Sequence, residues 1–173
     1  PYVDWFHFNP DRLQRRKHWG AYPDDFEQQQ LNNHVGSLDA LGYQAWWNLP
    51  ALPKFNTNTP AVREFIFSVA EHWIRFGADG WRLDVAAEIN DDSFWQEFRG
   101  RVKAANPESY IVAEIWHESQ RWLQGDQFDA VMNYQLTHAA LGFFGGEKID
   151  KPLAEGMMGL GSVHAIDAEQ FAR

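Results

Sequence analysis

The chain has 173 residues, of which 45% are hydrophobic and 23% are charged, so it is long enough to bury one core of ordinary composition. Its formal net charge of -9 and the lack of a basic run argue against binding to nucleic acid or to an anionic membrane, since both need clustered Lys and Arg. The sequence has no cysteine, no apolar run of membrane-spanning length and no signal-peptide pattern at its start, from which we expect a cytoplasmic location.

Aromatic residues make up 16% of the chain. Large aromatic side chains mostly fill protein cores, and they also meet the flat faces of sugar rings. A neutral substrate therefore fits this composition better than a polyanion.

Residues 1–59 are predicted to be rich in loops, because X-Pro pairs such as Asn9-Pro10 and Leu52-Pro53 restrict the backbone. The aromatic stretch Tyr43–Asn56 fits two interpretations, a wall beside a binding site or a packed loop. Trp47, within this stretch, is a candidate substrate-binding residue.

A helix is expected from residue 60 to residue 76, because Thr59 can cap it, Pro60 suits its first turn and Gly77 can end it. Its apolar residues recur at spacings of three and four and predict one broad buried stripe: Val62, Phe65, Ile66, Val69, Trp73 and Phe76. A second helix is expected over 92–105, with a buried side formed by Phe94, Trp95, Phe98 and Val102.

Three strand-like segments alternate with these helices: Gly80–Val85, Tyr110–Ile115 and Phe128–Tyr134. Such alternation predicts an α/β fold with a parallel sheet and helices outside it. Residues 135–146 are expected to continue as a helix, and Asp167–Arg173 to begin another.

Two of these segments each carry an acid near the end, Asp84 and Glu114. Parallel sheets bind their substrates at the carboxyl ends of their strands. Alternate residues of a strand share a face, so Arg82 lies beside Asp84 and can keep it ionised. Trp116 can desolvate Glu114 and hold it protonated. One Asp and one Glu in a shared cleft can then divide the nucleophile and acid roles.

Metal binding is the alternative use of these acids. His117 and Glu118 beside Glu114 offer nitrogen and oxygen ligands, but no second histidine stands at a spacing that completes a site. We therefore predict no metal site and no required cofactor. Calcium is a further option at Asp24 and Asp25, which are more often simply solvated.

Several motifs go beyond general patterns. Gly80–Val85 and Val112–His117 resemble, in order and spacing, two signature regions of the α-amylase family of glycoside hydrolases. Leu52–Asn56 resembles a third region, in the loop domain that precedes them. Phe128–Tyr134 resembles the next barrel strand of the neopullulanase, cyclomaltodextrinase and maltogenic amylase group.

The resemblance implies a (β/α)8 TIM barrel, of which residues 57–173 would be about strands 4 to 6 and residues 1–56 the end of the protruding loop domain. It implies that Asp84 is the nucleophile of a retaining mechanism, that Glu114 is the general acid and then base, and that Arg82 orients Asp84. Trp116 and His117 would line the site on the leaving-group side. Lys54, in the loop-domain motif, is a further candidate for substrate binding.

The implied substrates are α-glucan oligosaccharides, namely maltooligosaccharides, cyclodextrins or pullulan, cleaved by hydrolysis or transglycosylation. No nucleic acid or membrane partner is expected, and a homodimer of the parent enzyme is left open.

The sequence also departs from the family pattern. The third essential carboxylate is absent, since neither His138 nor His164 is followed by Asp, and Ala87 stands where the group commonly has Asn. A complete barrel takes about 250 residues, so we read the chain as an internal fragment that is inactive by itself. Two alternatives remain: a catalytically silent barrel that binds carbohydrate or a protein partner, and a complete small α/β domain.

Overall fold

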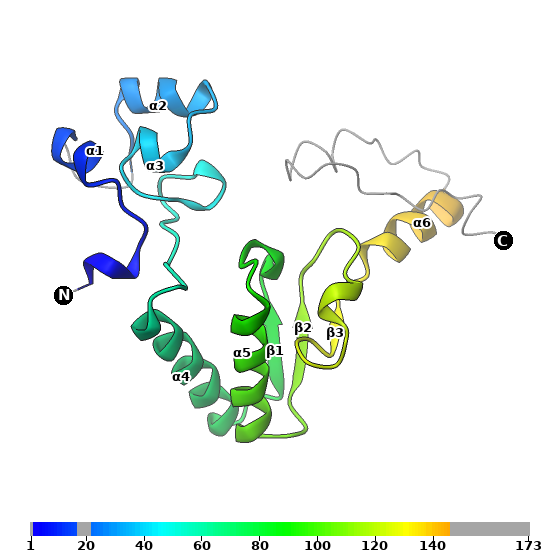
Figure 1. Ribbon diagram of the computed structural model, residues 1–173. Coiled ribbons are helices and arrows are strands. Elements are labelled where there is room, and N and C mark those ends of the chain that lie inside the picture. Colours follow the sequence, from blue (N-terminus) through cyan, green and yellow to red (C-terminus); the bar gives the residue numbers. More distant parts are fainter. Residues whose placement is uncertain (1, 17–21, 146–173) are drawn as a thin grey trace. The chain divides into compact units, whose positions relative to one another are not determined.

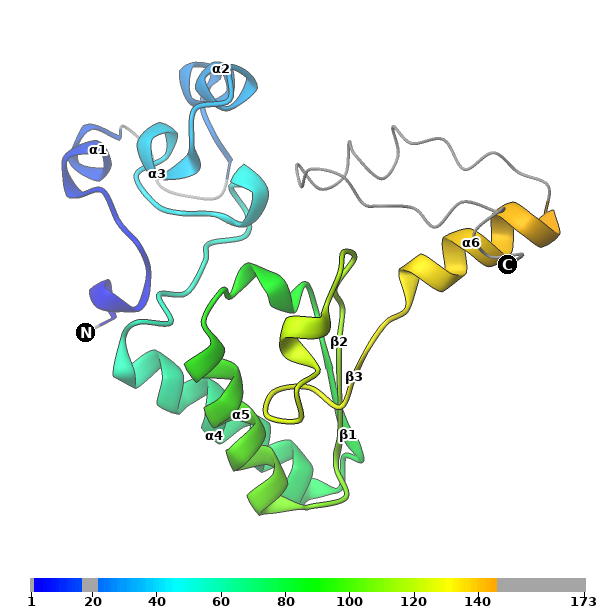
Figure 2. The same ribbon diagram turned by 45° about the vertical axis from the view of Figure 1, so that its right-hand side comes forward.

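The structure, a computed structural model shown in Figures 1 and 2, describes residues 2–16 and 22–145. Contacts divide the chain into two compact units, Pro1–Ile66 and Phe67–Arg173. The predicted boundary between residues 56 and 57 stays a prediction. His164 and the helix start expected at Asp167–Arg173 lie outside the described residues.

The first unit contains short helices joined by irregular chain. They are α1 (Pro10–Arg15), α2 (Asp25–Asn32) and α3 (Ser37–Ala40), with 3₁₀ turns at Val3–Trp5 and Trp46–Asn48. The prediction of a loop-rich segment overlooked these helices because each is too short to show a clear apolar period.

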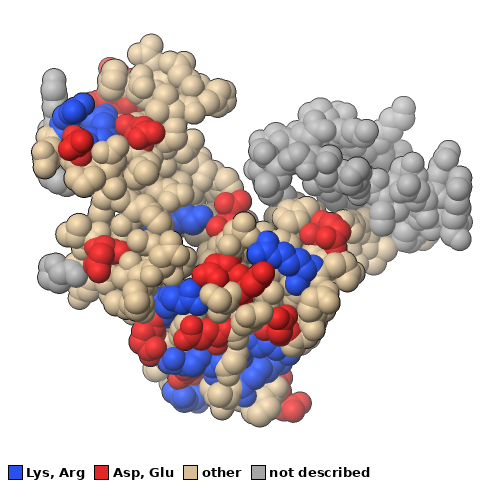
Figure 3. Space-filling view, in the orientation of Figure 1, with Lys and Arg blue, Asp and Glu red and all other residues tan. Residues whose placement is uncertain are grey.

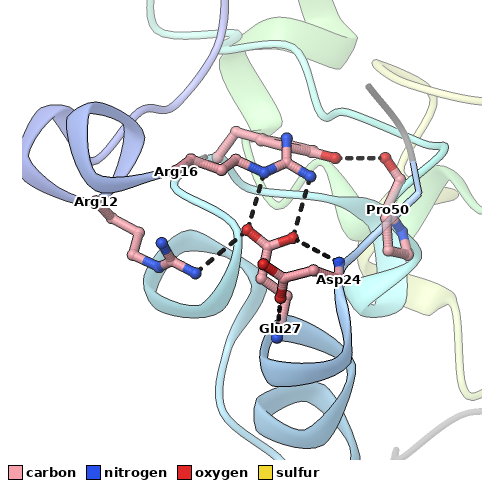
Figure 4. Close-up of polar contacts among 6 residues, drawn as sticks. Arg12, Arg16, Asp24, Glu27 and Pro50 are labelled. Atoms are coloured by element: carbon pink, nitrogen blue, oxygen red, sulfur yellow. Dashed lines mark hydrogen bonds and ion pairs between the residues drawn. The ribbon is translucent and has the colours of Figure 1, made fainter. Parts of the chain in front are cut away.

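The start of α2 is stabilised by a capping box. The Asp24 carboxylate accepts from the Glu27 backbone N–H at 2.8 Å, and Glu27 accepts from the Asp24 backbone N–H at 3.2 Å. Figure 4 shows that Glu27 also meets the guanidinium groups of Arg12 and Arg16. Asp24, one of the two optional calcium ligands, is therefore engaged in the helix start.

The aromatic stretch Tyr43–Asn56 folds back through isolated antiparallel bridges between Phe8 and Tyr43 and between Ala45 and Pro53. The Tyr43 hydroxyl donates to the Pro50 carbonyl at 2.7 Å. The buried core of this unit is Ala40, Leu41, Tyr43 and Ala45, packed against Phe8, Leu13, Leu31 and Val35. The start of the stretch is thus a packed loop, while Trp47 is 49% exposed.

The second unit is built on a three-stranded parallel sheet in the order β1-β2-β3, as the alternation of elements predicts. Its strands are β1 (Gly80–Leu83), β2 (Tyr110–Ala113) and β3 (Ala130–Val131). They are shorter than the predicted segments: β1 and β2 end earlier, and β3 both begins later and ends earlier.

The sheet is accompanied by α4 (Pro60–Phe76), which begins in the first unit, and by α5 (Asp92–Ala105), while α6 (Tyr134–Gly145) follows β3. Figures 1 and 2 show α4 and α5 on the same side of the strands. The predicted bounds of α5 and its buried side, Phe94, Trp95, Phe98 and Val102, are confirmed. No described helix is long and apolar enough to cross a membrane.

The predicted buried stripe of α4 is wrong in part. Phe65, Trp73 and Phe76 are 44%, 48% and 77% exposed, whereas the fully or nearly buried apolar residues are Val62, Phe67, Ala70 and Ile74. Both sets satisfy the helical period, and contacts with the rest of the unit choose between them. The Phe67 ring packs against Phe94 and Phe98 of α5, with centroids 5.1 and 6.4 Å away.

Ion pairs tie α5 to the sheet. Asp129, just before β3, accepts from Arg99 at 2.8 Å, from Lys103 at 2.9 Å and from the Ile111 backbone N–H of β2 at 2.9 Å. These contacts fix where β3 meets β2. Figure 3 shows acidic and basic side chains intermixed on the face of the second unit that is in view.

Candidate active site

Arg82 and Asp84 stand at the carboxyl end of β1. The Arg82 Nη1 atom donates to Asp84 Oδ1 in a salt bridge. This hydrogen bond raises the pKa of Arg82, and the nearby Glu114 carboxylate adds to the effect, so the guanidinium stays charged. The Asp84 side chain is 73% exposed, which leaves its carboxylate open to a reactant.

Glu114 directly follows β2 and lies beside the end of β1. Its backbone N–H donates to the Leu83 carbonyl at 2.8 Å, which extends the pairing of the two strands by one residue. Its side chain is only 9% exposed. The two acids therefore stand at the same edge of the sheet in different surroundings.

The buried Glu114 carboxylate has donors on both oxygens. Arg82 Nη2 lies 2.7 Å from Oε1, the Tyr134 hydroxyl donates to Oε1 at 3.0 Å, and the Val85 backbone N–H donates to Oε2 at 3.1 Å. A buried carboxylate without such partners would be costly. One guanidinium thus joins Asp84 and Glu114.

The turn after β1 places the donor from Val85. Val85 has φ 40 and ψ 46, in the left-handed region that a β-branched residue rarely adopts. A conformation of this kind costs about 1–3 kcal/mol and is typical of functional sites. It ends the strand and turns the Val85 N–H toward Glu114.

Tyr134, at the start of α6, is the site residue that the sequence interpretation missed. Its ring stacks on Trp116, with centroids 3.8 Å apart and planes at 13°. Burial raises the pKa of Tyr134, and the hydrogen bond to Glu114 raises it further. The sequence places Tyr134 at the end of the predicted segment Phe128–Tyr134. This position alone does not distinguish a tyrosine of the active site from one of the core.

Trp116 thus contacts Tyr134, and Tyr134 in turn contacts Glu114. The predicted role of Trp116 in keeping Glu114 protonated stays a prediction. His117 contacts its own loop: its Nδ1 lies 2.8 Å from the Glu118 carbonyl, and its ring centroid is 5.6 Å from that of Trp122. Within residues 2–16 and 22–145, no group of three or more His, Cys, Asp or Glu side chains could hold a metal ion.

The other two candidates for substrate binding, Trp47 and Lys54, belong to the first unit. Lys54 Nζ lies 4.4 Å from the ring centroid of Trp46, in a cation–π contact. Trp47 has φ 47, which turns the chain and leaves its ring half exposed. Their predicted roles stay predictions.

Comparison with known proteins gives a consistent result. Residues 1–160 match the family model described as the alpha-amylase catalytic domain. A cyclomaltodextrinase from Bacillus sp is 44% identical over 144 residues, which are 83% of this chain and 22% of that protein. Neopullulanase 2 from Thermoactinomyces vulgaris is 48% identical over 115 residues, which are 64% of this chain and 20% of that protein.

A solved structure is also similar. The crystal structure of a protein from Thermus thermophilus has a TM-score of 0.71 and 53% sequence identity to this chain. The similarity covers 94% of this chain and 30% of that one. The chain thus spans about a fifth of the length of the two curated relatives.

Proposed function

Because the chain belongs to the alpha-amylase family, whose catalytic-domain model matches residues 1–160, we propose that it is part of a retaining glycoside hydrolase. The proposed substrates are maltooligosaccharides, cyclodextrins or pullulan, in line with the names of its cyclomaltodextrinase and neopullulanase relatives. The observation that carries the proposal is the pair Asp84 and Glu114, joined by Arg82 at the carboxyl ends of two adjacent parallel strands.

The different exposure of the two acids supports a division of roles. Asp84, open to solvent and paired with Arg82, attacks the anomeric carbon and forms a covalent glycosyl-enzyme. Glu114, nearly buried, gives its proton to the leaving glycosidic oxygen. It then takes a proton from the water that attacks the anomeric carbon and frees Asp84, so that the anomeric configuration is retained.

The proposed fold of the parent protein is a (β/α)8 barrel. In this fold β1, β2 and β3 are barrel strands four, five and six, and the first unit is the end of the protruding loop domain. The position of both acids just past the strand ends supports this, because TIM barrels carry their active sites at that face. The third carboxylate of the chemistry is then supplied by another part of the parent.

Substrate binding is proposed for Trp116 and His117 on the leaving-group side and for Trp47 and Lys54 from the loop domain. The stacked rings of Trp116 and Tyr134 support an aromatic surface next to the acids. We further propose that the parent needs no cofactor and acts in the cytoplasm, and that the isolated fragment is inactive. A homodimer of the parent is left open.

The test is steady-state kinetics of the full-length parent protein on maltotriose, β-cyclodextrin and pullulan. We expect Asp84→Asn and Glu114→Gln each to lower turnover by several orders of magnitude, because each removes a group that takes part in bond making or breaking. Glu108→Gln is the matched control, since Glu108 lies before the amino end of β2 and should leave turnover unchanged.

Wild-type turnover in either acid variant would contradict the assigned roles. A wild-type parent that binds cyclodextrin without cleaving it would instead support the silent carbohydrate-binding barrel. Trapping of the glycosyl-enzyme with a fluorinated α-glucosyl fluoride, followed by peptide mass analysis, should place the sugar on Asp84.

A further inference from the structure

The Tyr134 side chain is held between two residues that follow β2. Its ring lies parallel to that of Trp116, at a centroid distance of 3.8 Å, and its hydroxyl donates to Glu114 Oε1 at 3.0 Å. Trp116 stands two residues after Glu114, so a single loop supplies both contacts. The hydroxyl also lies 3.7 Å from the Met132 sulfur, on the chain that leaves β3.

The partners of Glu114 differ in what they can do. Arg82 and the Val85 backbone N–H are hydrogen-bond donors only, and Arg82 is shared with Asp84. A hydroxyl can donate to a carboxylate and can accept from a protonated carboxyl group. Of these described partners, Tyr134 alone can both donate to the Glu114 carboxylate and accept from the protonated carboxyl group.

We propose that Tyr134 is a positioning residue that keeps the Glu114 carboxyl group aimed in both halves of the reaction. Trp116 fixes the tyrosine ring, and the tyrosine hydroxyl fixes Oε1, while Val85 holds Oε2. The inference rests on the proposed function, in which Glu114 serves first as acid and then as base.

The charges around Glu114 are consistent with a neutral tyrosine. Among the described residues, the charged and titratable groups that contact Glu114 or share its arginine are Arg82, Asp84 and Tyr134. Burial and the bond to Glu114 both raise the pKa of Tyr134, so its hydroxyl keeps its proton at neutral pH. His117, on the same loop, contacts the Glu118 carbonyl.

The experiment uses Tyr134→Phe in the full-length parent, which keeps the ring and removes only the hydroxyl. For maltotriose we expect kcat/KM to fall roughly 10- to 100-fold, the size of one hydrogen bond to a charged group. For α-glucosyl fluoride, whose leaving group needs little proton donation, kcat/KM should change far less.

Tyr110→Phe is the matched control. Tyr110 is 54% exposed at the start of β2, away from the acids, and its variant should behave as wild type toward both substrates. The thermal unfolding midpoint of each variant checks its folding. A Tyr134→Phe protein that loses both activities equally would reveal a merely structural role and would overturn the inference.

The outcomes separate this inference from the proposed function. If the wild-type parent cleaves no α-glucan, the proposed function fails. If the wild type is active and Tyr134→Phe keeps its preference between the two substrates, the positioning role alone fails.

Discussion

In the first unit, the carboxylate of Glu27 is bound by two arginine side chains (Figure 4). Its side chain is fully buried and lies 2.9 Å from Arg16 Nε and 3.2 Å from Arg12 Nη2. Burial raises the pKa of Glu27, but the hydrogen bonds from Arg16 and from the Asp24 backbone outweigh it, so the pKa lies below its ordinary value of 4.5. The carboxylate therefore links α1, α2 and the chain between them in its charged form.

Glu27→Gln should destabilise the full-length parent by about 3–5 kcal/mol, because it leaves two partly buried guanidinium groups without their carboxylate. Urea unfolding followed by tryptophan fluorescence measures the change. Asp25→Asn is the control, since this exposed acid in the first turn of α2 contributes about 0.5 kcal/mol through the helix dipole.

The Glu27→Gln variant also tests how the stability of the protein depends on pH. Because the folded pKa of Glu27 is lowered, its stabilising contribution is present above pH 4.5 and is lost as the pH falls through the folded value. Wild-type stability should thus approach that of Glu27→Gln in acid. An equal difference between the two proteins at every pH would contradict this account.

Gly80 shows at the scale of the element how closely β1 and β2 approach. A Cβ atom on Gly80 would clash with the Tyr110 carbonyl oxygen, which belongs to backbone that cannot easily move. The first register pair of the two strands therefore depends on the lack of a side chain. The same register determines how Asp84 and Glu114, which follow the other ends of these strands, lie relative to each other.

Gly80→Ala should destabilise the parent by about 1–3 kcal/mol, as overpacking does, and should lower activity by shifting β1 against β2. Gly100→Ala, in α5, is the matched control, because a Cβ atom there meets nothing within 4 Å. It should raise stability by about 0.5–1 kcal/mol through helix propensity. Thermal unfolding and turnover of both variants are the measurements, and equal effects would refute the role of the close approach.

At the scale of the whole molecule, the three parallel strands have no further strand beside β1 or beside β3 within the described part of the chain. Parallel sheets are normally covered on both faces, and barrels have no edges at all. The exposed aromatic residues of α4, among them Trp73 and Phe76, also indicate a missing cover, because large apolar patches are rarely exposed to solvent. We expect the rest of the parent barrel to cover them.

The isolated 173-residue chain should therefore bind an apolar dye and unfold without a sharp transition, whereas the full-length parent should unfold cooperatively. Calorimetry and dye fluorescence of the two proteins, measured in parallel, test this. A single cooperative transition of the isolated chain would support the alternative of a complete small α/β domain.

Several features follow from the sequence alone, because their signals are local. The 3.6-residue period over 92–105 predicts the bounds and the buried side of α5, and the alternation of segments predicts the parallel sheet. The motifs around Asp84 and Glu114 predict the family and place both acids at strand ends.

Other features depend on contacts between residues far apart in the chain, which no local pattern carries. The apolar residues of α4 fit two faces equally well, and only packing against α5 decides that Phe67 is buried and Trp73 is exposed. The bond from Tyr134 to Glu114 forms because β3 runs parallel to β2 and brings the start of α6 to the strand ends. Sequence determines which acids stand at the sheet edge, and tertiary structure decides which groups hold them there.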